Sequence, residues 1–440
     1  MFDKLFGLGK KKAEPQPEPD IIFGRYSDNN KPVAKVNRWT DADKFFKEKK
    51  YTESFDAFFD YLRDDAVQNV SYERNDTEGK FQFYQGTKIV RGNFNNELLK
   101  AEVILAQMPQ PSVPVMRRLL EMNFNLYYNR FALDKDRLCM NFDSDIASAS
   151  PSKLYYGLKE LATKADKQDD LLMQDFTALQ TADSEHVTAI PQPEKETKYE
   201  YLQKWIKQTL DTIASADPEK FSGGNAYLLL SLIYRIDYLV APEGKLLTDL
   251  EKTAFIYFKK DDRPVAEKNR DMIEEFKKIL DKPKEEIFSC LYRSWHTFSI
   301  TAPQQYKAIT DSIHGANTNM IWYRDNGNTY FATQIVEYGI SYCQYSYSLP
   351  KAITELFHLF MQVNYPEYFV ALGYTTAYYD PKTNEFARQG ILDKIKAIQD
   401  KWKDKFPLLD FKMQNLKFDN LVNFDLTFTN EMELLNTDPK

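Results

Sequence analysis

Glycine is scarce in this sequence, and the scarcity argues against a nucleotide-binding fold. Only 15 of the 440 residues are glycine. None lies in a GxxxxGK[ST] or GxGxxG motif, whose glycines let backbone amides approach a phosphate closely. The GxSxG motif of a nucleophile elbow is missing as well. No stretch of 18 consecutive apolar residues occurs, so the sequence contains no candidate membrane-spanning helix.

Metal-binding and redox motifs are also absent. The three cysteines lie far apart in apolar or aromatic surroundings: Cys139, Cys290 and Cys343. This spacing indicates buried free thiols in a reducing cytosol rather than disulfides. The four histidines all lie outside any HExxH or CxxC context: His186, His296, His314 and His358. A lone histidine among apolar neighbours is more often packed than ligating, so we expect neither a metal nor another cofactor.

The residues that are plentiful are those of packed cores. Hydrophobic residues make up 43% of the chain, with 31 Phe and 28 Tyr, which excludes global disorder. A chain of this length is expected to form two or three domains. Lysine and arginine are interspersed with acidic residues and the formal net charge is -7, so a nucleic-acid partner is disfavoured.

Residues 1–20 form a tail with an apolar start, a basic centre and a proline-rich end. The apolar residues precede the lysines, which reverses the order of a secretory signal: Phe2, Leu5 and Phe6, then Lys10, Lys11 and Lys12. One interpretation is a short interfacial helix whose lysines meet anionic lipid. The alternative is a tail without a membrane role. The predicted location is the cytoplasm, with peripheral contact at the inner membrane under the first interpretation.

Residues 39–177 predict an α+β domain in which helices pack on an antiparallel sheet. A helical hairpin is expected over 39–64, with Thr40 and Thr52 as caps. Three strands follow between 69 and 108, and then a helix from about 115 to 122. Two strands flank a turn at Lys135 and Asp136, and a last helix begins after the N-cap Ser150.

The alternation of residues in the hairpin over 123–145 assigns side chains to faces of the sheet. The residues predicted to face the core are Phe131, Leu133, Leu138 and Met140. Tyr128 and Arg130 fall on the other face, where we expect them to contact a partner polypeptide. Asp143 and Asp145 follow the second strand as a pair of carboxylates. A solvated strand end is favoured over a cation or hydrolase site, because no third ligand is placed by the sequence.

The remainder of the chain predicts a linker over 178–199, a helical domain over 200–300 and a second α+β region over 318–440. The last region is expected to open with strands and to continue with a helix over 350–363 and a hairpin over 369–387. This order suggests a degenerate repeat of the first domain. Tyr342, Tyr345 and Tyr347 would lie on the second face of these strands and bind a partner. The alternative is a face that the protein's own helices cover.

Residues 113–172 resemble the YbjN family and the type III secretion chaperone-like fold. The similar features are a helix that ends at Asn123, the hairpin "FALDKDRLCMNFDSD" and the helix "SPSKLYYGLKELATKAD". With the upstream strands the resemblance covers about residues 53–176, under a third of the chain. It implies a small α+β domain that pairs with or binds other proteins and that has no catalytic residues. This chain departs from the family in being far longer.

The function predicted from these patterns is non-enzymatic, chaperone-like protein binding in a bacterial cytosol. The sheet around residues 81–142 would hold a partner polypeptide or pair with a second copy. One alternative is a structural component of a secretion or injection assembly. Another is an enzyme with a pocket near Asp325, Tyr338 or His358. No catalytic residue is named, because the sequence places no base beside a serine or cysteine.

Overall fold

An antiparallel sheet organises the N-terminal part of the chain. The computed structural model describes residues 18–28, 31–215, 217 and 219–438. The strands run in the order β1-β2-β3-β4-β6-β5, with β7 pairing with β4 beyond the end of β3. Their bounds are β1 (Val70–Asn75), β2 (Glu78–Gln85), β3 (Lys88–Phe94), β4 (Leu98–Gln107), β5 (Arg130–Asp134), β6 (Arg137–Asp145) and β7 (Gln180–Thr181).

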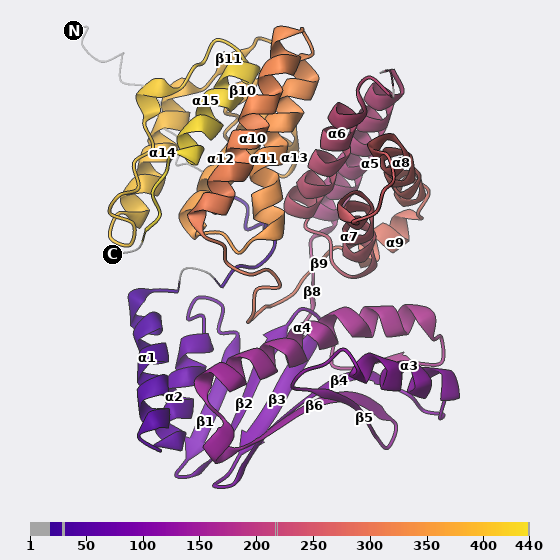
Figure 1. Cartoon of the computed structure of the whole chain (residues 1–440), viewed down its shortest axis with the longest axis vertical. Coiled ribbons are helices and arrows are strands. Elements are labelled where there is room, and N and C mark those ends of the chain that lie inside the picture. The colour runs from indigo at the N-terminus through magenta and orange to yellow at the C-terminus, as the bar shows by residue number, and fades with distance from the viewer. Residues whose placement is uncertain (1–17, 29–30, 216, 218, 439–440) are drawn as a thin grey trace, which may run out of the picture.

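The helices α1 to α4 accompany this sheet, as Figure 1 shows. They are α1 (Val33–Lys47), α2 (Tyr51–Leu62), α3 (Val113–Asn123) and α4 (Pro151–Asp175). The helical hairpin and the capped helix of the sequence prediction are therefore confirmed, and the Ser150 side chain accepts a hydrogen bond from the Lys153 amide. The predicted caps Thr40 and Thr52 are wrong, because α1 starts at Val33 after Pro32 and α2 starts at Tyr51.

One face of the sheet is apolar and covered by helices, and the other is polar. A cross-strand row of buried side chains passes through the paired strands: Val70, Phe83, Val90, Val103, Met140 and Phe131. Residues of the opposite parity, such as Lys80, Arg91 and Lys100, are exposed. Three strands were expected between 69 and 108, and the structure has four, because Gly86, with a φ of 56°, makes a tight turn that divides the middle one into β2 and β3.

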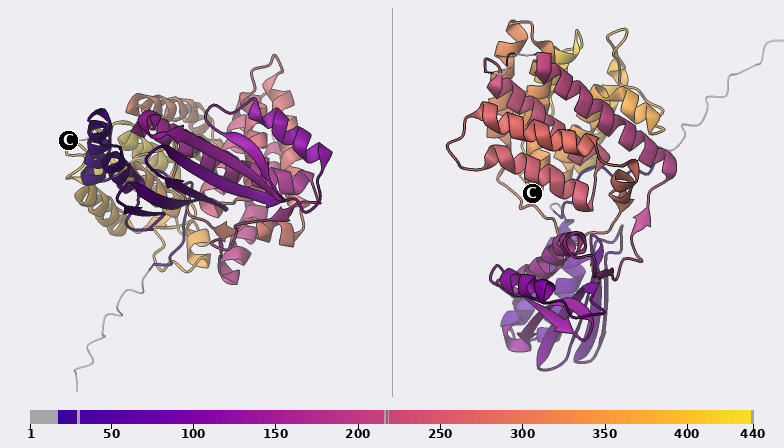
Figure 2. Two further views of the ribbon diagram at one scale, coloured as in Figure 1. Left: turned by 90° about the horizontal axis from the view of Figure 1, so that it is seen from below. Right: turned by 90° about the vertical axis from the view of Figure 1, so that its right-hand side faces the viewer.

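The chain from residue 192 onward is largely helical, which confirms the mixed α+β class. Figure 2 shows this helical half stacked on the sheet half. Its longer helices are α5 (Gln192–Ser215), α6 (Ser222–Arg235), α7 (Gly244–Phe258), α8 (Val265–Leu280), α10 (Tyr306–Asp325), α11 (Thr329–Ser346), α12 (Lys351–Asn364), α14 (Arg388–Trp402) and α15 (Leu421–Glu433). The shorter ones are α9 (Lys284–Ser289) and α13 (Pro366–Ala371).

The strands predicted between 318 and 348 are wrong, since this segment forms α10 and α11. Aromatic and β-branched residues favour strands locally, but here they pack at helical spacing into a core. Phe331, Ile335 and Gly339 are spaced four residues apart on one face of α11. Gly339 lets α10 approach closely, since a Cβ added at this glycine would lie 2.5 Å from the Cβ of Ala316. The sheet of the first domain is therefore not repeated here.

The C-terminal part ends with a short hairpin and a helix. The hairpin expected over 369–387 is confirmed only in its second part, as the short pair β10 (Tyr379–Asp380) and β11 (Glu385–Phe386), because residues 369–371 belong to α13. The alternation of apolar and polar residues at the end of the sequence is typical of a strand, but Leu421–Glu433 forms α15. Its residues Phe424, Phe428 and Met432 follow helical spacing and are fully buried.

A strap from the helical half completes the core of the sheet half. Residues 292–301, the C-side strap, start with β9 (Tyr292–Arg293) and cross the sheet end near Gly86. Phe298 is fully buried and its ring packs against Phe83 and Tyr155. Gln85 fixes the strap, because its Oε1 accepts from the Phe298 amide at 3.0 Å and its Nε2 donates to the Phe298 carbonyl at 3.2 Å.

A second strap runs the opposite way. Residues 18–28, the N-side strap, precede the sheet in the sequence but pack on the helical half. Phe23 contacts the rings of Tyr238, His358 and Phe369. Arg25 forms an ion pair with Asp237 at 2.8 Å, and the two side chains are only 12% and 4% exposed. Each half is therefore completed by a segment that connects to the other.

The substitution Phe298→Ala tests the role of the C-side strap. We expect a loss of about 3–5 kcal/mol in the free energy of unfolding, because the large ring leaves a cavity in the sheet-half core. Denaturant unfolding followed by circular dichroism measures it. Ile300→Ala is the matched control in the same strap, since this side chain is 43% exposed. Equal losses for the two variants would contradict the assigned role.

Candidate functional site

The loop between α3 and β5 is an ordered platform held by one carboxylate. Glu160, on α4, accepts hydrogen bonds from the backbone amides of Tyr127, Tyr128 and Asn129 at 2.9, 2.8 and 3.2 Å. The Asn129 side chain adds a bond of 2.7 Å to the same carboxylate. Hydrogen bonds to an ionised acceptor are stronger than neutral ones, so this loop has a defined conformation.

The side chains of this platform point into solvent rather than into the core. Phe124 and Tyr127 are each 91% exposed, and Tyr128 is 43% exposed. The helix before them continues the surface, because Val113 and Leu120 are 65% and 66% exposed. We call the following residues the outer face of α3: Val113, Arg117, Leu120, Glu121 and Phe124.

The outer face of α3 exists because this helix carries two apolar stripes. Val115, Leu119 and Met122 are buried and pack into the sheet-half core. Val113, Leu120 and Phe124 lie on the other side, at spacings that also place residues on one helix face. A helix that only covers the sheet needs the first stripe alone. The second stripe is therefore available for an interaction with another molecule.

The predicted residues of the β5–β6 hairpin have mixed outcomes. Arg130 is exposed on the polar face, as expected, but it forms an ion pair with Asp143 on the neighbouring strand. Phe131, Leu138 and Met140 are buried, which confirms their assignment to the core. Leu133 was assigned wrongly, because it is 44% exposed near the end of the edge strand β5.

The tyrosines predicted on a C-terminal sheet lie on or just after a helix instead. Tyr342 and Tyr345 belong to α11, and Tyr347 follows its last residue. All three are half-buried and pack against the core of the helical half. Tyr345 lies under the Arg25 guanidinium, whose carbon is 4.3 Å from the ring centroid. These side chains take part in internal packing, so the strand face on which they were predicted to lie does not exist. Their contact with a partner stays a prediction.

The remaining predictions concern the N-terminal tail, membrane-spanning helices, metal ligands and the cysteines. Phe2, Leu5, Phe6 and the three lysines of the tail lie outside the described residues. Among the residues that the structure does describe, no helix is long and apolar enough to cross a membrane. In the same ranges, no three His, Cys, Asp or Glu side chains gather in a way that could hold a metal ion. The three cysteines are buried and free, as predicted.

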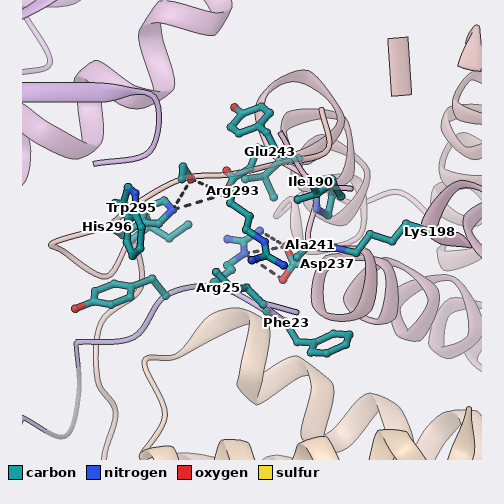
Figure 3. A pocket seen from close by; sticks show the side chains of 18 of the residues that line it. Phe23, Arg25, Ile190, Lys198, Asp237, Ala241, Glu243, Arg293, Trp295 and His296 are labelled. Carbon is teal, nitrogen blue, oxygen red and sulfur yellow. Dashed lines mark hydrogen bonds and ion pairs between the residues drawn. The ribbon is translucent and has the colours of Figure 1, made fainter. Parts of the chain in front are cut away.

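A cavity of about 210 Å³ opens between the two halves (Figure 3). Both straps line it, together with the start of α5 and the segment between α6 and α7. Its charged groups are paired with each other: Arg25 with Asp237 at 2.8 Å, and Lys198 with Glu194 at 3.0 Å. The enzyme hypothesis expected a pocket near Asp325, Tyr338 or His358, and none of these lines this cavity.

His358 is a packed histidine, as predicted for a lone histidine among apolar residues. Its Nδ1 lies 3.1 Å from the Tyr238 hydroxyl, and its ring contacts Phe23 and Phe369. Burial lowers the pKa of its imidazole to about 4, so the ring is neutral at ordinary pH. This side chain stabilises the N-side strap.

Ser294, His296 and Glu243 line the cavity in an arrangement that superficially matches a catalytic triad. The Ser294 hydroxyl lies 3.1 Å from His296 Nε2, and Glu243 Oε1 lies 3.6 Å from the same nitrogen. In a working triad the carboxylate holds the other ring nitrogen. Here Gln85 Nε2 occupies that position, 3.1 Å from His296 Nδ1.

The orientation of Gln85 decides which nitrogen of His296 carries the proton. Because its Oε1 accepts from the Phe298 amide, its Nε2 must donate to His296 Nδ1. Nδ1 therefore accepts, and Nε2 carries a proton that is directed at Ser294 and Glu243. Burial lowers the pKa of this imidazole, but the hydrogen bond and charge of Glu243 outweigh it and raise the pKa above its ordinary value. A nitrogen that already carries a proton cannot take one from Ser294. The trio therefore fixes the C-side strap and does not activate a nucleophile.

No family model matches the sequence, and no curated protein matches it either. The site must therefore be argued from its own geometry. Sequence analysis placed Tyr128 and Arg130 near the platform but missed Phe124, Leu120 and Glu160. The spacing of Val113, Leu120 and Phe124 was a usable signal for a second apolar stripe. Nothing in the sequence marked Glu160, since it is one of several acids on a long helix.

The substitution Glu160→Ala tests whether this carboxylate holds the platform. We expect the amides of residues 127–129 to exchange with solvent about tenfold faster or more, because three charge-assisted bonds are lost. Hydrogen exchange followed by mass spectrometry measures this. Asp175→Ala, an exposed acid on the same helix, is the control and should leave these amides unchanged. Unchanged exchange in Glu160→Ala would contradict the account.

Proposed function

We propose that this protein is a non-enzymatic protein-binding module that associates with a second copy of itself through the outer face of α3. The observation that carries the proposal is the exposure of large apolar side chains on ordered backbone. Phe124 and Tyr127 are 91% exposed although hydrogen bonds to Glu160 fix the loop beside them. Contiguous apolar surface of this kind marks interaction sites on soluble proteins.

The charges on this face favour a second copy as the occupant. Arg117 and Glu121 flank the apolar stripe and are exposed, and neither forms an ion pair within the described part of the chain. Two copies of α3 can pack antiparallel, with their outer faces in contact and a twofold axis that crosses the helices at the level of Leu119. Arg117 of each copy then meets Glu121 of the other. Phe124 then packs against the N-terminal end of the other helix, near Val113. A surface that complements itself in this way fits an isologous dimer.

The resemblance of residues 113–172 to the YbjN family and the type III secretion chaperone-like fold supports the same class of function, because it implies a domain that pairs with or binds polypeptides. The polar face of the sheet and the edge strand β5 remain available for a partner segment. A chaperone-like role in a bacterial cytoplasm is therefore part of the proposal. Tyr128 and Arg130 lie where such a segment would run.

The substitution Leu120→Asp tests the dimer. We expect the wild-type chain to be dimeric by size-exclusion chromatography with light scattering, and the variant to dissociate. Placing a charge at the centre of an apolar interface should weaken association about 30-fold or more, the effect typical of a hot-spot residue. Leu408→Asp is the matched control, because Leu408 is 60% exposed on a different part of the chain. A monomeric wild-type chain at every concentration tested would contradict the proposal.

A charge reversal tests the packing of the two helices. Arg117→Glu places two acids opposite each other and should weaken the dimer. The double variant Arg117→Glu with Glu121→Arg restores opposite charges across the twofold axis, so it should regain most of the lost affinity. Failure of the double variant to recover, with the single variant weakened, would exclude the antiparallel arrangement.

A further inference from the structure

The cavity between the two halves combines charged groups with exposed apolar side chains. Large apolar residues that remain exposed lie on its wall: Ile22, Trp295 and Ile300, at 51%, 39% and 43%. Its volume of about 210 Å³ is several times the about 30 Å³ that one water molecule occupies in the liquid. The cavity therefore has room for a small organic molecule, and an apolar body bound there would be removed from water.

Part of the cavity wall is unusual backbone at the end of α6. The turn Ile236–Val240 is π-helical, and the Ala241 amide donates to the Ile236 carbonyl, five residues back, at 3.2 Å. Ala241 is left-handed, with a φ of 48°, although it is not a glycine. Both features cost free energy and are frequent at functional sites. Here they place Asp237 and Ala241 on the cavity wall.

Arg293 is the one charged group of the wall without a buried counter-ion of its own among the described residues. It shares Glu194 with Lys198: the two carboxylate oxygens lie 3.6 Å from Arg293 Nη2 and 3.0 Å from Lys198 Nζ. The other acid near Arg293 is Asp20, whose side chain is 96% exposed, so water weakens its effect. At this end of the cavity two cations thus face one buried acid.

The remaining acid of the wall, Glu243, is already engaged. Its Oε1 accepts from the Ser294 hydroxyl at 3.2 Å and lies 3.6 Å from His296 Nε2. Burial lowers the pKa of the Lys198 ammonium, and the charge of Arg293 adds to this shift, which Glu194 opposes. Arg293 Nε is buried and has no hydrogen-bond acceptor within the described part of the chain. An anion beside this guanidinium would therefore be stabilised.

We propose that this cavity binds a small organic carboxylate, with its acid group at Arg293 and its apolar body along the exposed apolar side chains of the wall. A planar guanidinium matches the geometry of a carboxylate. Figure 3 shows Arg293 and Trp295 of the C-side strap at the same cavity as Arg25 of the N-side strap. Apolar walls with a few polar groups, placed between domains, are typical of small-molecule sites.

Binding at this cavity would stabilise the folded chain. Both halves contribute to the wall, since Val67 belongs to the sheet half and Asp237 to the helical half. A ligand that contacts both binds the folded state and not the unfolded one, so it raises the melting temperature. The inference does not depend on the dimer, because no residue of the outer face of α3 lines the cavity.

Calorimetric titration and thermal unfolding of the full-length chain test the site, with hydrocinnamate and hexanoate as probes. Each carboxylate is compared with its amide, which has the same body without the charge, and with acetate, which has the charge without the body. We expect at least one carboxylate to bind and to raise Tm, and its amide and acetate to bind about tenfold more weakly or less. No binding of either carboxylate at about 10 mM, or equal binding of each carboxylate and its amide, would overturn the proposal.

Two variants assign the binding to this cavity. Arg293→Gln removes the charge and should weaken carboxylate binding about tenfold or more, whereas Arg270→Gln, at a 72% exposed position, should not. Val67→Trp fills the cavity from the sheet half and should block binding, with Val370→Trp as the exposed control. Should Arg293→Gln fail to fold, Val67→Trp still decides. Undiminished carboxylate binding in every folded variant of the pair would overturn the assignment.

Discussion

The exchange of straps between the two halves is the constraint on which the rest of the structure depends. The N-side strap brings Arg25 to Asp237 in the helical half, and the C-side strap brings Phe298 to Phe83 in the sheet half. A buried ion pair is costly to break because the remaining charge is left without a partner, and a buried ring is costly to remove because it leaves a cavity. The two contacts lie at the same junction, where Arg25, Asp237 and Phe298 line one cavity. The relative position of the halves is thus held by packing and charge, not only by the covalent connection.

This constraint explains why charged side chains gather at the junction while exposed apolar side chains lie elsewhere. Charged groups that gather at the junction are paired with each other: Lys198 with Glu194 within α5, and Arg25 of the N-side strap with Asp237 of the helical half. The arrangement of Ser294, His296 and Glu243 belongs to the same attachment, since Gln85 holds the ring in the wrong tautomer for a general base. The apolar groups without an internal role lie elsewhere, on α3 and the loop that Glu160 orders. A protein whose exposed chemistry is apolar contact area, on a fixed scaffold, is suited to binding another polypeptide.

Local patterns in the sequence predicted the secondary structure of the sheet half correctly in most elements, but not that of the helical half. Strand alternation identified the buried row at Phe131 and Met140, and the Ser150–Pro151 pair identified the start of α4. Around Phe331 and Ile335 the same composition of aromatic and β-branched residues was read as strand, but tertiary packing selects helix there. The straps could not be predicted, because Phe298 and Arg25 act on residues more than two hundred positions away. Of the platform, the sequence identified Tyr128 but not Glu160, the carboxylate that orders the loop.

Differential scanning calorimetry of the full-length chain tests the central claim most directly. If each half is completed by a strap from the other, neither half is stable after the other unfolds. The account predicts a single transition, with a calorimetric enthalpy equal to the van't Hoff enthalpy. Two separable transitions, each with its own enthalpy and each belonging to one half, would contradict it.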